Sequence, residues 1–194
     1  MTIKQLVMDA TLAALSIILY LVKFSLPIFP QFLEMNLSML PIIIAVLLFR
    51  FRDASIIVVL RLVGKLIFMG TTTQYVGEIA DIFLGLIVVI IMSLIKKKTT
   101  NPFILTGLII LSWTLGGVVS NLAINIPLYI KFMGITMDDL VNMCSIIPGI
   151  NKDNFLLYYS LFAVVPFNLI LSSCVGIVSI LVYGRLKRIE KLQS

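Results

Sequence analysis

The stretch RLVGKLIFMGTTTQYVGEIADIFLG, residues 61–85, carries the feature that decides the fold class, which is charge set between long apolar runs. Arg61 and Lys65 are four residues apart, and Glu78 and Asp81 are three apart, so each pair shares one face of a helix. Ionisable side chains at membrane depth are costly, and they usually face a protein interior or an aqueous cavity. The stretch therefore predicts two helices whose cationic and acidic faces meet.

Two interpretations of this meeting stay open. In the first, the four charges line or rim a ligand pocket, and Thr72 in the polar break at 70–74 contributes to it. In the second, the cations pair with the acids and hold the two helices together without contacting a ligand. Both interpretations place the stretch inside a membrane protein.

Composition supports this class. Hydrophobic residues make up 60% of the 194, charged residues only 12%, and the mean hydropathy is +1.14. A soluble domain of this size has no interior for so much apolar surface, so we expect an all-α polytopic membrane protein.

The same composition argues against catalysis. The chain has no His, which removes the usual general base and the commonest metal ligand. It also lacks phosphate-loop, nucleophile-elbow and zinc-protease motifs. We therefore expect no enzymatic activity, no metal and no cofactor. The net charge of +6 needs no nucleic acid to explain it, because the basic residues cluster at the ends of apolar runs.

Apolar runs divide the chain into six predicted transmembrane helices within one membrane domain, 1–194. The runs are 5–26, 37–49, 54–69, 75–95, 103–130 and 155–183. The first run carries Ala10, Ala13 and Ala14, and small residues four apart form a strip on which another helix can pack closely.

Basic residues predict the orientation. With six spans, the N-terminus, the turns at 50–53 and 96–101 and the tail lie on one side, and most Lys and Arg residues are there. The positive-inside rule then places both termini in the cytoplasm. Glu34, Asn36 and the loop at 131–154 fall outside, so we expect Cys144 in that loop to be accessible and Cys174 to pack within the last helix.

Three asparagines are further candidates for ligand binding. Asn121 and Asn125 are four apart and share a helix face, and Asn168 follows Pro166 inside the last apolar run. A proline at membrane depth frees a carbonyl and marks irregular backbone. The alternative is that these amides hydrogen-bond between helices, which is a common use of Asn in membranes.

Three stretches resemble a known family, the substrate-binding S-components of energy-coupling factor (ECF) transporters, and in particular its riboflavin branch. They are FLEMNLSMLP (32–41), GTTTQYVGEIADIFLG (70–85) and PFNLILSSCVGIVSILVYGRL (166–186). The resemblance implies a multi-pass protein of the bacterial cell membrane with six helices and an outward-facing vitamin site. It also implies that Ala10 and Ala14 dock on a transmembrane coupling subunit, which works with two ATPase subunits.

The chain departs from the riboflavin branch at two places. Leu171 stands where that branch has a lysine three residues after the asparagine, and Arg61 and Lys65 add cationic character. An anionic vitamin such as pantothenate is therefore the alternative substrate. A stand-alone secondary carrier is the alternative of another class, although no inverted repeat supports it.

Overall fold

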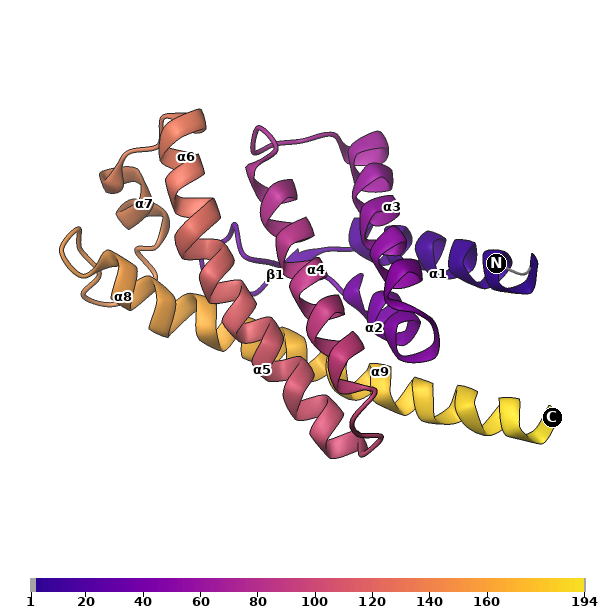
Figure 1. Cartoon of the computed structure of the whole chain (residues 1–194). Coiled ribbons are helices and arrows are strands. Elements are labelled where there is room, and N and C mark those ends of the chain that lie inside the picture. Colours follow the sequence, from indigo (N-terminus) through magenta and orange to yellow (C-terminus); the bar gives the residue numbers. More distant parts are fainter. Residues whose placement is uncertain (1–2, 194) are drawn as a thin grey trace.

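The structure is a computed structural model that describes residues 3–193, and it is built almost entirely of helices (Figure 1). The α-helices are α1 (Ile3–Leu21), α2 (Met39–Leu48), α3 (Phe51–Met69), α4 (Val76–Ile95), α5 (Pro102–Ser120), α6 (Ile126–Met133), α7 (Met137–Met143), α8 (Phe155–Tyr159) and α9 (Val165–Gln193). Two π-helical turns, η1 (Asn121–Asn125) and η2 (Ser160–Val164), and two short strands, β1 (Phe24–Ser25) and β2 (Glu34–Met35), complete the described chain.

The predicted apolar runs from 54 onward match these helices. The run at 54–69 lies in α3 and the run at 75–95 in α4, while the last two runs are the continuous rods α5–η1–α6 and α8–η2–α9. The first run was predicted to reach residue 26, and this was wrong. Helix α1 ends at Leu21, because Phe24 and Ser25 pair as an antiparallel strand with Met35 and Glu34.

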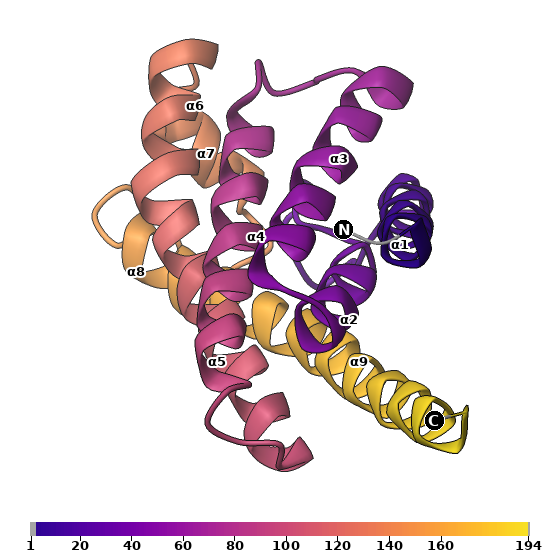
Figure 2. The same cartoon turned by 45° about the vertical axis from the view of Figure 1, so that its right-hand side comes forward.

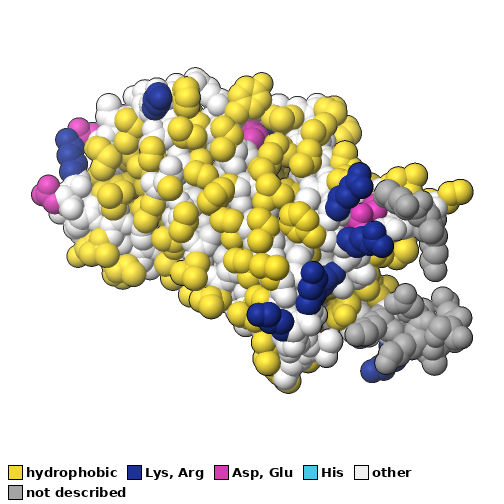
Figure 3. All heavy atoms as spheres, in the orientation of Figure 1, with side chains coloured by type: hydrophobic (Ala, Val, Ile, Leu, Met, Phe, Trp, Pro, Cys, Tyr) yellow, Lys and Arg dark blue, Asp and Glu magenta, His cyan; other side chains and the backbone are white. Residues whose placement is uncertain are grey.

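Among the described residues, three helical segments are long and apolar enough to cross a membrane: Val76–Ile95, Pro102–Met133 and Phe155–Leu186. Shorter apolar helices lie at Gln5–Leu21 and Met39–Leu48. On the face drawn in Figure 3, hydrophobic side chains cover the middle of the molecule, and Lys and Arg gather toward the lower right. The six-span count and the cytoplasmic placement of both termini remain predictions.

Both π-helical turns occur just before a proline. The amide of Ile126 donates to the carbonyl of Asn121, five residues earlier, and Pro127 follows. In the same way Val165 donates to Ser160, and Pro166 follows. A proline inside a helix lacks an N–H and clashes with the carbonyl four residues before it. The wider π turn accommodates that clash, so each rod continues past its proline.

The two rods cross near the middle of the molecule (Figures 1 and 2). Helix α9 passes α5, and the contact is close because a Cβ on Gly117 would lie 2.6 Å from Oδ1 of Asn168. Helix α1 packs along α3, where a Cβ on Gly64 would lie 2.5 Å from Ile17. Helices α6, α7 and α8 gather at the end farthest from the start of α1 and the end of α9.

Candidate functional site

The charges of the stretch 61–85 pair with one another across α3 and α4. Arg61 Nη2 lies 2.5 Å from Asp81 Oδ2, and Lys65 forms an ion pair with Glu78. The Arg61 side chain is only 1% exposed. Its other terminal nitrogen, Nη1, donates to Ser38 Oγ at 2.9 Å, so the N-cap residue of α2 joins the network.

The same network fixes the break at 70–74. Lys65 Nζ donates to the carbonyl of Gly70 at 2.8 Å, and Thr73 Oγ1 donates to Glu78 Oε2 at 3.1 Å. Thr72 is exposed beside them. These ion pairs agree with the second interpretation, in which the cations pair with the acids and hold α3 and α4 together. A contact of Arg61, Lys65, Thr72 or Glu78 with a ligand remains a prediction.

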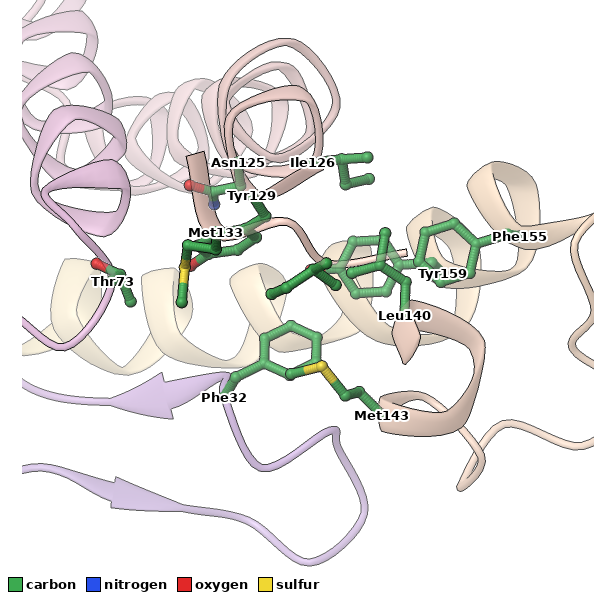
Figure 4. Close-up of a pocket in the computed structure, with 11 residues that line it drawn as sticks. Phe32, Thr73, Asn125, Ile126, Tyr129, Met133, Leu140, Met143, Phe155 and Tyr159 are labelled. Atoms are coloured by element: carbon green, nitrogen blue, oxygen red, sulfur yellow. The ribbon is translucent and has the colours of Figure 1, made fainter. Parts of the chain in front are cut away.

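A cavity lies at the end of the molecule where α6, α7 and α8 meet (Figure 4). Side chains reach it from the β1–β2 loop, the 70–74 break, η1–α6, α7 and α8. The described lining is uncharged and largely apolar, and it consists of Phe32, Thr73, Asn125, Ile126, Tyr129, Met133, Ile135, Leu140, Met143, Phe155 and Tyr159. Its aromatic rings are close to one another, with Phe155 stacked on Tyr159 at 5.4 Å and Phe32 at 6.0 Å from Tyr159.

The π turn η1 organises the polar groups at this cavity. Asn121 Oδ1 accepts hydrogen bonds from Tyr159 at 2.8 Å and from Asn125 Nδ2 at 3.2 Å. The remaining Asn125 acceptor, Oδ1, is buried and has no hydrogen-bond partner among the described residues. A buried acceptor without a partner is unfavourable, so this oxygen is suited to receive a donor from a ligand.

A second cavity adjoins the first. It lies between the loop that joins β1 to β2 and the C-terminal end of α7. Phe32 and Met143 line both cavities, whose volumes are about 100 and 760 Å³. These two side chains therefore lie at the boundary between a small aromatic cavity, called the inner cavity below, and a wider one, called the outer cavity.

Three other predicted site residues have local partners. Glu34 pairs with Lys23 at 2.5 Å. Asn36 Oδ1 accepts from the Ser38 backbone at 3.1 Å and from its hydroxyl at 2.6 Å. Asn168 is buried at the α5–α9 crossing and donates to the carbonyl of Val164 at 2.8 Å. Within the described lining of the two cavities, only Asn125 comes from the predicted set.

Sequence reasoning missed the aromatic members of the first cavity. Phe32, Tyr129, Phe155 and Tyr159 looked like ordinary membrane residues, since each adjoins an apolar run. One signal was present, because all four lie near the ends of runs that the charge pattern places on the same side.

The small-residue strip of α1 is partly open. Ala10 and Ala14 are exposed, whereas Ala13 is 4% exposed and packs inward. A flat exposed strip is compatible with close approach of another helix, and docking there remains a prediction.

The cysteine expectations were wrong. Cys144 is fully buried although its segment connects two helices, and Cys174 is exposed on α9. Burial raises the pKa of the Cys144 thiol to about 12. The reason is that Leu140, Cys144 and Ile147 form the inner face of the α7 segment and join the core.

Comparisons with known proteins agree on one family. Residues 4–183 match the model described as "ECF transporter, substrate-specific component". The chain is 30% identical over 193 residues to the riboflavin transporter RibU of Streptococcus thermophilus, covering 96% of this chain and 84% of the relative. It is 27% identical over 191 residues to RibU of Staphylococcus aureus, covering 97% and 93%.

A solved structure shares the fold. It is described as the S component of a bacterial ECF transporter, and its TM-score to this chain is 0.60 at 23% identity. The match covers 97% of this chain and 98% of the solved one.

Proposed function

We propose, because this chain belongs to the family of ECF transporter substrate-specific components, that it binds riboflavin outside a bacterial plasma membrane and delivers it inward. A transmembrane coupling subunit and two ATPase subunits would drive the delivery. The relatives named as riboflavin transporters support this substrate.

One observation carries the choice of substrate, namely an uncharged cavity lined by aromatic rings. Phe32, Phe155 and Tyr159 offer flat apolar faces, against which a fused aromatic ring can stack. Asn125 Oδ1 offers an unpaired acceptor. Riboflavin has a neutral fused ring with an N–H on its edge, so it complements both features.

The volumes indicate how the ring enters. Vitamin-sized ligands occupy pockets of roughly 300–1,000 Å³, and the inner cavity of about 100 Å³ is smaller than this range. Displacing Phe32 and Met143 would join it to the outer cavity of about 760 Å³. We infer that the ring passes these two side chains and that the hydroxylated chain of the vitamin stays in the outer cavity.

Pantothenate fits the site less well. A carboxylate requires a cation or several hydrogen-bond donors in a pocket. No ionised residue appears in the described lining of either cavity, and Arg61 and Lys65 are engaged with Asp81 and Glu78. The cationic character that suggested an anionic vitamin is therefore neutralised within the helix pair.

The proposed orientation follows the charges. Six spans with cytoplasmic termini place the basic turns at 50–53 and 96–101 inside and both cavities outside. The exposed Ala10 and Ala14 then lie in the cytoplasmic half of α1, where a coupling subunit is reachable.

The test is riboflavin uptake by proteoliposomes, with the chain alone and with an ECF coupling module. Accumulation that requires both the module and ATP inside the vesicles is expected. Uptake by the chain alone would instead support the stand-alone carrier, and ATP-dependent uptake of pantothenate without riboflavin would overturn the substrate.

A further inference from the structure

A groove at the opposite end of the molecule from the two cavities is a candidate second binding site. It lies between the α2–α3 turn and the C-terminal end of α4, and its volume is about 550 Å³. Its lining is Phe49, Arg50, Phe51, Ile90, Ser93, Leu94, Lys96 and Lys97. This set combines cations and one hydroxyl with large apolar side chains.

The cations of this groove outnumber the acidic groups near them. None of Arg50, Lys96 and Lys97 forms an ion pair with a described residue. Lys96 Nζ instead donates to the carbonyls of Val46, at 2.5 Å, and Phe49 at the end of α2. Burial lowers the pKa of Lys96, the neighbouring Lys97 lowers it further, and Asp53 raises it, so the positive charge here is only partly compensated.

A second, independent observation concerns Ser93. This residue is 8% exposed, and its hydroxyl is buried without a hydrogen-bond partner among the described residues. It lines the groove beside the cations. A buried hydroxyl without a partner is costly, so Ser93 is suited to donate to an acceptor that enters the groove.

Helix α3 adds positive potential here, since its N-terminus begins at Phe51. Asp53 in the first turn offsets part of that potential. Its Oδ2 is already engaged, accepting from the Arg50 amide at 3.2 Å and from Gln5 at 2.7 Å. These donors are neutral, so Asp53 keeps its negative charge, but the three cations Arg50, Lys96 and Lys97 outnumber it and the groove stays net positive.

Exposed apolar surface adjoins the basic part of the groove. Phe51, Ile90 and Leu94 are 45, 44 and 60% exposed. Phe51 also lines a neighbouring groove along α3 with Ile56, Val59 and Leu60. A small soluble anion would leave this apolar surface in contact with solvent, whereas a hydrocarbon chain would bury it.

We propose that this groove binds an anionic phospholipid, with the phosphate between Arg50, Lys97 and Ser93 and an acyl chain along Phe51 and α3. This site is separate from the riboflavin site and does not depend on it. A lipid held there would cover the junction of α2, α3 and α4 at the membrane surface, where basic groups attract acidic head groups.

The test is native mass spectrometry of the full chain in detergent, titrated with dioleoyl phosphatidylglycerol and, separately, dioleoyl phosphatidylcholine. Preferential binding of one phosphatidylglycerol is expected. Because each basic residue near a membrane surface contributes about 1 kcal/mol, Lys97→Gln should weaken that binding about fivefold. Lys98→Gln is the matched control, since Lys98 is exposed in the same run but does not line the groove.

Ser93→Ala tests the hydroxyl and should weaken phosphatidylglycerol binding roughly threefold. Equal losses for Lys97→Gln and Lys98→Gln would show only diffuse charge attraction and overturn the site. Displacement of the lipid by inorganic phosphate at equal concentration would assign the groove to soluble anions. Stoichiometric displacement by an ECF coupling subunit would assign it to a protein interface. Unchanged melting temperatures of the variants exclude misfolding as a cause.

Discussion

Replacing Arg61 by Gln should destabilise the protein while leaving riboflavin affinity nearly unchanged. Arg61 is 1% exposed and is held by Asp81 at 2.5 Å, by Ser38 at 2.9 Å and over the Tyr20 ring at 5.4 Å. Gln keeps some packing but removes the charge, so Asp81 loses its partner. Breaking a buried ion pair from one side costs about 3–5 kcal/mol.

The lower end of that range applies here, because the Asp81 side chain is 23% exposed and water reaches it. A loss of about 3 kcal/mol corresponds to a fall in melting temperature of about 6–12 °C for a chain of this length. The double variant Arg61→Gln/Asp81→Asn should recover most of this loss, since no charge is then left unpaired.

The assay is thermal unfolding in detergent together with riboflavin titration, for the single variants and the double variant. Arg52→Gln is the matched control, because Arg52 is exposed on the same helix and forms no ion pair with a described residue. An unchanged melting temperature with riboflavin affinity lowered more than about tenfold would refute the reasoning. It would make Arg61 a ligand-binding residue.

The site and its surroundings make four other outcomes testable. Asn125→Ala should weaken riboflavin binding roughly two- to tenfold, because the ligand loses the free acceptor Oδ1. A fluorescence titration measures this, and unchanged affinity would exclude the contact. Ala14→Trp should abolish co-purification with a coupling subunit but keep riboflavin binding, and loss of both would mean that α1 has misfolded. Because burial raises the pKa of Cys144 to about 12, its reactive thiolate is scarce below that pH, so maleimide should not label it at pH 7–9. An exposed Ser145→Cys should be labelled on intact cells, whereas labelling of Lys97→Cys from outside would contradict the orientation.

The pairing of α3 with α4 was open to prediction from sequence because it depends on short spacings. Arg61 with Lys65, and Glu78 with Asp81, each occupy one face of a helix, and charge at membrane depth needs a partner. The spacings alone do not decide whether Arg61 pairs with Asp81 or with Glu78, and Lys65 with the other acid. Only the structure shows that Arg61 meets Asp81 and Lys65 meets Glu78.

The cavity was much less predictable, since apolar and aromatic residues carry no distinctive spacing. Phe32, Tyr129 and Tyr159 come from the β1–β2 loop, α6 and α8, which are far apart in the sequence and meet only in the folded chain. The π turn that orients Asn125 toward the cavity depends on a hydrogen bond between residues five apart, and no periodic pattern of the sequence predicts such a turn. Pro127 was its only trace in the sequence.

The most direct test of the central claim is titration of the purified chain, alone in detergent, with riboflavin while flavin fluorescence is measured. The proposed function predicts saturable quenching at one riboflavin per chain, competition by flavin analogues and no competition by pantothenate. An absence of quenching at any riboflavin concentration, or saturable binding of pantothenate in its place, would contradict it.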